Sequence, residues 1–162
     1  MTLSPLEIFL VIIIISQIIF ILYLLLTHKE SFVENDPKLL QLNELMTDFF
    51  ERHKGTWNEP VRSLIGNKNP MKEISLQTAA KSYTINKQAV HMCMKEEDGD
   101  YYPDNTLIYV LAHELAHVIC DETGHTEKYN TIFDQLLLKL QEDGLYDPSI
   151  YINRDYCEWT TE

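Results

Sequence analysis

The sequence predicts an α+β fold in which an apolar helix precedes one globular domain built from a small sheet and several helices. An uncharged apolar run covers residues 8–26. Residues 72–94 include short stretches that alternate apolar and polar side chains, as half-buried strands do. Residues 36–53, 105–119 and 126–144 carry apolar side chains at the spacing of a helix face.

The run at residues 8–26 predicts a transmembrane helix, because at about 1.5 Å per residue it matches the thickness of a bilayer core. A cleaved signal peptide fits less well, since no basic residue precedes the run and no small-residue cleavage site follows it. We therefore expect a short tail at residues 1–7, a single-pass membrane protein and a polar linker at residues 27–35. The Lys and Arg distribution around the run favours a cytosolic domain.

The globular domain is expected at residues 36–162. Asp36 and Pro37 predict a helix start, with the aspartate as N-cap and proline in the first turn. Residues 72–77 and 82–94 are predicted strands, in which Tyr83 and other alternating apolar residues would face the core. Its length is sufficient for one core and one domain.

Residues 113–117 read His-Glu-Leu-Ala-His within the helix predicted at residues 105–119, with Asn105 as its expected N-cap. Histidines four residues apart project from the same helix face and can bind one zinc ion. A glutamate after the first histidine can act as general base toward a metal-bound water. The pattern predicts His113 and His117 as zinc ligands and Glu114 as the catalytic base.

A catalytic zinc usually has a third protein ligand. His125 is the leading candidate, because Gly124 before it can adopt the left-handed conformation that ends a helix and turns the chain back. Thr126 would then cap the next helix. Acidic side chains remain alternatives for the third position: Asp121, Glu122, Glu127 and Glu142.

The formal net charge of −12 argues against nucleic acid as a partner, because an acidic surface repels phosphates and no basic stripe offsets it. The chain has three cysteines, Cys93, Cys120 and Cys157. This odd number predicts no disulfide framework and suits a reducing compartment. Cys120, three residues after His117, is expected in the core rather than at the metal.

Residues 105–129, with HELAHVIC followed by GHT and an aromatic-apolar helix, resemble the WLM and SprT-like zincin metallopeptidases. The similarity is greatest to small members encoded by large DNA viruses of eukaryotes, and it extends to Gly144-Leu145-Tyr146 and Tyr156-Cys157. It covers roughly residues 75–160. The resemblance implies a zincin-like minidomain with one zinc per chain, a protein or peptide substrate, and a host or virion membrane if the protein is viral.

In zincins an edge strand beside the active-site helix aligns the substrate by strand addition. The resemblance assigns this role to residues 88–95, which are Gln88, Ala89, Val90, His91, Met92, Cys93, Met94 and Lys95. A tyrosine from the aromatic tail at residues 145–162 is expected to stabilise the oxyanion. The alternative function is a catalytically inactive, anchored zinc-binding interaction protein. A further alternative is an anchored adaptor that uses the helix at residues 36–53.

Overall fold

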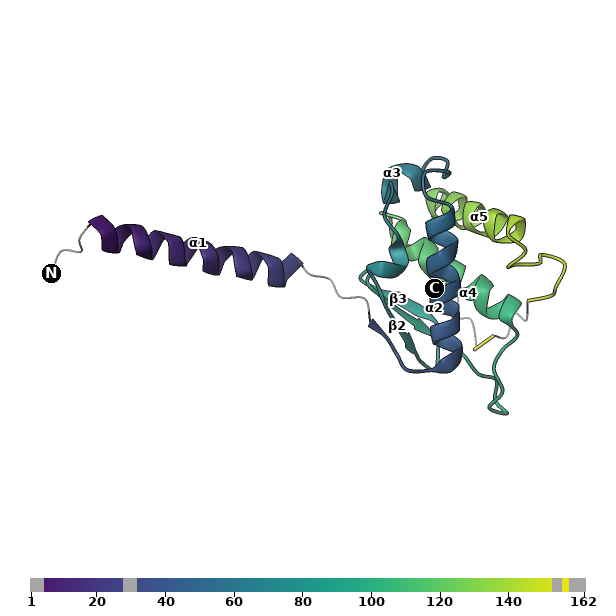
Figure 1. The fold of residues 1–162 in the computed structure, drawn as a ribbon. Helices are drawn as coiled ribbons and strands as arrows, with labels where there is room; N and C mark the ends of the chain where they lie inside the picture. The colour runs from purple at the N-terminus through teal and green to yellow at the C-terminus, as the bar shows by residue number, and fades with distance from the viewer. Residues whose placement is uncertain (1–4, 28–31, 153–155, 158–162) are drawn as a thin grey trace.

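A computed structural model describes residues 5–27, 32–152 and 156–157. Within these residues the chain forms an amino-terminal helix and an α+β domain (Figure 1). The predicted class of the domain is confirmed. Trp159, one of the aromatic residues of the tail, lies outside the described residues.

The apolar run forms helix α1, Pro5–Thr27, and its side chains between residues 9 and 22 are exposed. Yet no helix is long and apolar enough to cross a membrane in the part of the chain that the structure describes. This finding contradicts the predicted transmembrane helix at residues 8–26 and the single-pass membrane localisation that rested on it.

The sheet has the strand order β1-β2-β4-β3. Its strands are β1 (Phe32–Val33), β2 (Ser75–Thr78), β3 (Tyr83–Ile85) and β4 (Ala89–Met92). β2 runs parallel to β1 and to β4, while β3 and β4 form an antiparallel hairpin. β1 lies in the segment predicted as a linker, so the folded domain begins before residue 36.

The helices of the domain begin where local capping predicts or close to it. α2 spans Pro37–Arg52, and the Asp36 carboxylate accepts hydrogen bonds from two amides of its first turn. Short elements follow, α3 (Val61–Ile65) and the 3₁₀ turn η1 (Pro70–Lys72). α4 spans Asp104–Ile119 and α5 spans Glu127–Glu142.

The expected N-cap at Asn105 is wrong by two positions, because Pro103 occupies that place and Asn105 lies in the first turn of α4. The Asn105 side chain instead exchanges two hydrogen bonds with the backbone of Asp147, at 2.8 and 3.1 Å. These bonds attach the segment after α5 to the beginning of α4.

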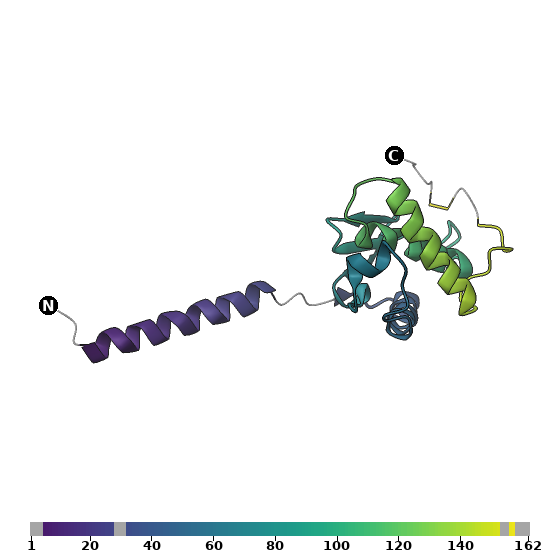
Figure 2. The same cartoon turned by 90° about the horizontal axis from the view of Figure 1, so that it is seen from above.

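Helix α4 lies at the centre of the domain. It contacts β3 and β4 on one side and α5 on the other (Figure 2). Leu107, Val110, Leu111 and Leu115 are fully buried along it. A helix packed on two sides has little freedom to move, so side chains that project from α4 are held in fixed positions.

Candidate metal centre

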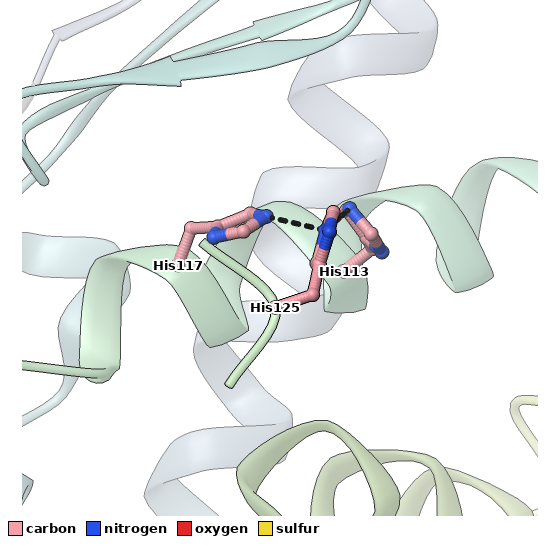
Figure 3. Close-up of side chains that lie close together, drawn as sticks. All are labelled: His113, His117 and His125. Carbon is pink, nitrogen blue, oxygen red and sulfur yellow. Dashed lines mark hydrogen bonds between the residues drawn. The ribbon is translucent and has the colours of Figure 1, made fainter. Parts of the chain in front are cut away.

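Three histidine rings converge beside α4 (Figure 3). His113 and His117 project from consecutive turns of α4, and His125 reaches them from the loop between α4 and α5. Nε2 of His125 lies 3.2 Å from Nε2 of His113 and 3.2 Å from Nε2 of His117. Candidate ligand atoms of all three lie within 4.8 Å of one another.

This spacing fits a zinc ion. Zinc binds histidine nitrogens at about 2.0–2.1 Å with tetrahedral geometry, which places neighbouring ligand nitrogens about 3.3 Å apart. The two Nε2 separations of 3.2 Å in the structure are close to that value. The donor set is therefore suited to one zinc ion.

The left-handed conformation predicted for Gly124 is confirmed, but this glycine does not end α4, which stops at Ile119 with Cys120 as its extended C-cap. Gly124 adopts a φ of +81°, and the Thr126 hydroxyl caps α5 by accepting a hydrogen bond from the Tyr129 amide. Lys87, in the β3–β4 turn, donates hydrogen bonds to the backbone carbonyls of Cys120 and Glu122. The loop that carries His125 is thus fastened to the sheet.

The acidic alternatives for a third ligand do not join this cluster. Asp121 forms an ion pair with Lys128 at 2.6 Å. Glu122, Glu127 and Glu142 are exposed, and the potential metal-binding group found among the described residues contains histidines alone.

The surroundings keep two of the histidines neutral, which is the form that binds a metal. Burial, together with repulsion from the neighbouring imidazoles, lowers the pKa of His113 to about 3 and that of His117 to about 4. The Tyr129 ring stacks on His117 with centroids 4.3 Å apart, and its hydroxyl donates to the His113 carbonyl at 3.2 Å. Tyr129 therefore holds the ring of His117 and the backbone of His113 in place.

Glu114 lies on α4 between the two helical histidines and is only 3% exposed. Burial raises its pKa to about 7, partly opposed by a hydrogen bond from the Thr84 hydroxyl to Oε2 at 2.7 Å. A carboxylate whose pKa is near neutrality exchanges protons readily at physiological pH. Its place on α4 directly after His113 is that of the general base in the His-Glu-x-x-His pattern.

The strand assigned to substrate alignment occupies an interior position. β4 pairs with β2 on one side and with β3 on the other, so residues 89–92 have no open edge. Among the described strands, β3 is the edge strand on the side of α4 and carries Thr84 against Glu114. His91 stacks on Tyr83 with ring centroids 4.6 Å apart and does not belong to the histidine cluster.

The face of β3 that packs against the core also differs from the prediction. Tyr83 and Ile85 are exposed, and Thr84 between them faces α4. The alternation of the strand was recognised, but its apolar residues were placed on the wrong face. This misplacement hid the role of Thr84, whereas Lys87 lies in the turn after β3 and contacts residues more than 30 positions away in sequence.

The inference from the cysteine count, no disulfide framework and a reducing compartment, does not anticipate the disulfide that the structure contains. Cys93, which directly follows β4, is joined to Cys157, and Cys120 is free and buried. The cysteine count therefore gives no argument for a reducing compartment, since disulfides persist mainly in oxidising ones. Cys120 does occupy the core, as expected.

The described tyrosines of the tail do not supply an evident oxyanion donor. Tyr146 packs on Tyr109, and Tyr151 is 75% exposed. Tyr156 is buried, and its hydroxyl donates to the Cys93 carbonyl. It fastens the tail beside the disulfide.

Comparison with known proteins identifies relatives in large DNA viruses. The chain is 45% identical over 100 residues to an uncharacterized protein of Invertebrate iridescent virus 6, covering 60% of this chain and 56% of that protein. It is 37% identical over 101 residues to an uncharacterized protein of Invertebrate iridescent virus 3, covering 58% and 64%. An uncharacterized protein of Acanthamoeba polyphaga mimivirus is 27% identical over 148 residues, covering 81% and 73%.

The chain thus spans less than two thirds of the length of the two iridescent virus proteins. No protein-family model and no solved structure matches it. These relatives support the expected similarity to proteins encoded by large DNA viruses.

Proposed function

We propose that this protein is a zinc-dependent metallopeptidase that hydrolyses peptide bonds. The observation that carries the proposal is the convergence of His113, His117 and His125 at the spacing of a tetrahedral zinc ion, with the buried Glu114 on the same helix directly after His113. Membership of the zincin metallopeptidases, inferred from the HELAH and GHT motifs, is part of the same proposal.

The three histidines would hold the metal through their Nε2 atoms. A bound zinc ion lowers the pKa of its water toward neutrality and polarises a carbonyl group. Glu114 accepts the proton of the attacking water and delivers it to the leaving amine.

The substrate is a protein or peptide chain, and the β3 edge replaces residues 88–95 as the strand that aligns it. β3 is open on the side away from β4 and packs against α4 close to Glu114. An extended peptide added there would lie beside the histidine cluster. The net charge of −12 disfavours nucleic acid as the substrate.

The test measures metal content and proteolysis in the full chain. We expect about one zinc per chain and cleavage of an unfolded protein such as reduced casein. Glu114→Gln should retain the zinc and lose at least about 100-fold in cleavage rate, the usual contribution of a general base. Glu127→Gln, at an exposed position, is the matched control and should behave as the wild type.

Zinc bound without cleavage would favour the alternative, a zinc-binding interaction protein without catalytic activity. Undiminished cleavage by Glu114→Gln would end the assignment of the general base. A chain purified without zinc and unable to bind it would refute the proposal as a whole.

A further inference from the structure

The hydroxyl of Thr84 makes a close polar contact with the side chain of Glu114. Thr84 Oγ1 lies 2.7 Å from Glu114 Oε2 and 3.2 Å from the Glu114 carbonyl oxygen. A hydroxyl has one hydrogen to donate. The carboxylate oxygen is closer than the carbonyl oxygen and is the stronger acceptor of the two. Thr84 therefore gives its hydrogen bond to Oε2.

The position of this hydroxyl is set by the fold. Thr84 pairs with Val90 across the hairpin, and Val90 is fully buried on the face that packs against α4. The neighbours Tyr83 and Ile85 point to the opposite, exposed face. Because threonine is branched at Cβ, its side chain has few accessible rotamers, so the hydroxyl is held in one direction.

The hydrogen bond from Thr84 restricts the orientation of the Glu114 carboxylate. A glutamate has several rotatable bonds, and burial alone does not select one orientation of its two oxygens. The bond to Oε2 restrains the position of that oxygen, and Oε1 does not share this partner. Within the described part of the chain, the bond from Thr84 is the hydrogen bond that the Glu114 carboxylate accepts.

We infer that Thr84 is a positioning residue for Glu114, holding Oε2 so that Oε1 accepts the proton of the attacking water. This inference rests on the proposed metallopeptidase function. Thr84 acts through Glu114 and does not itself touch the reacting atoms.

The fold offers a matched control for this contact. Thr78, on β2 of the same sheet, donates its hydroxyl to the carboxylate of Glu34 at 2.9–3.0 Å. Thr78→Val removes a threonine–glutamate hydrogen bond outside the proposed site. Any effect common to Thr78→Val and Thr84→Val would reflect the sheet and not Glu114.

The experiment measures the binding of acetohydroxamate to the zinc-loaded full chain, alongside zinc content and peptide cleavage. Acetohydroxamate gives up its hydroxyl proton when it binds a metal, and Glu114 is the acceptor beside the histidines. Thr84→Val should weaken binding by about 10-fold or more, the loss typical of a hydrogen bond to a charged group, without loss of zinc. It should also lower kcat with little change in KM.

Thr84→Ser, which keeps the hydroxyl, should stay within about threefold of wild type, and Thr78→Val should bind as the wild type does. In a Glu114→Gln background, Thr84→Val should add no further loss, because the two residues act as a unit. If Thr84→Val does not fold, Thr84→Ala replaces it in the same comparisons.

Wild-type chain that holds zinc but binds no acetohydroxamate would refute the proposed function. Wild-type binding that is unaltered in Thr84→Val would overturn the role of Thr84 alone. Equal losses in Thr84→Val and Thr84→Ser, or loss of zinc from Thr84→Val, would also overturn it, since the hydroxyl would then not be the cause.

Discussion

Replacing Glu114 with glutamine should stabilise the metal-free protein at high pH. The carboxyl group is 3% exposed, and burial raises its pKa from 4.5 to about 7. The difference between these two pKa values corresponds to about 3 kcal/mol of folding free energy. Glutamine has nearly the same shape, accepts the same hydrogen bond from Thr84, and is never charged.

The sign follows from the direction of the shift. A raised pKa contributes stability that is fully present below pH 4.5 and is lost as the pH rises through 7. The wild type suffers this loss and the variant does not. His113 and His117, whose pKa values are lowered, are present in both chains and cancel in the comparison. The stability gap should therefore widen by about 2–3 kcal/mol from pH 5 to pH 8.

The assay is urea denaturation followed by circular dichroism, with a chelator present, at both pH values. With a denaturant slope of about 1–3 kcal/mol per molar urea, the gap between the two midpoints should grow by roughly 1 M or more. Glu127→Gln, at an exposed site, should show no such growth. A gap between Glu114→Gln and wild type that stays constant with pH would refute the reasoning.

Three further predictions concern the metal loop and the tail. His125→Ala should lower zinc affinity more than about 100-fold, measured by competition with a chromogenic chelator, while His91→Ala should not; unchanged affinity would return the third position to an acidic residue. Lys87→Met should weaken zinc binding about 10-fold in the same assay, because it frees the loop carbonyls, and Lys87→Arg should restore most of it. Cys157→Ser should lower the unfolding free energy by about 2–4 kcal/mol under non-reducing conditions, and a strong reductant should remove the difference from wild type.

Local sequence was sufficient for the part of the site that lies on one helix. His113, Glu114 and His117 are related by helical periodicity, so their common face follows from their spacing. The approach of His125 was predictable in part, because Gly124 turns the chain and Thr126 caps the next helix, although α4 ends at Ile119, five residues before Gly124. These features depend on contacts a few residues apart.

The contacts that depend on distant segments were not predictable in the same way. The face of β3 that packs on α4 is set by its pairing with β4, and a shift of one residue exchanges Thr84 with its exposed neighbours. The pairing of Cys93 with Cys157 joins residues 64 apart in sequence. The interior position of β4 depends on β2 lying beside it, which alternation of side chains along one strand does not encode.

The short strand β1 bears on how this protein can be shortened. Val33 pairs with Leu76, and the backbone amide of Glu34 donates to the Leu76 carbonyl at 2.9 Å. The Glu34 carboxylate accepts from the amide of Thr78 at 2.7 Å. A chain that begins at residue 36 would lack these partners of β2, so β2 would become an unpaired edge strand. We expect copies of the shortened chain to pair along this edge and aggregate.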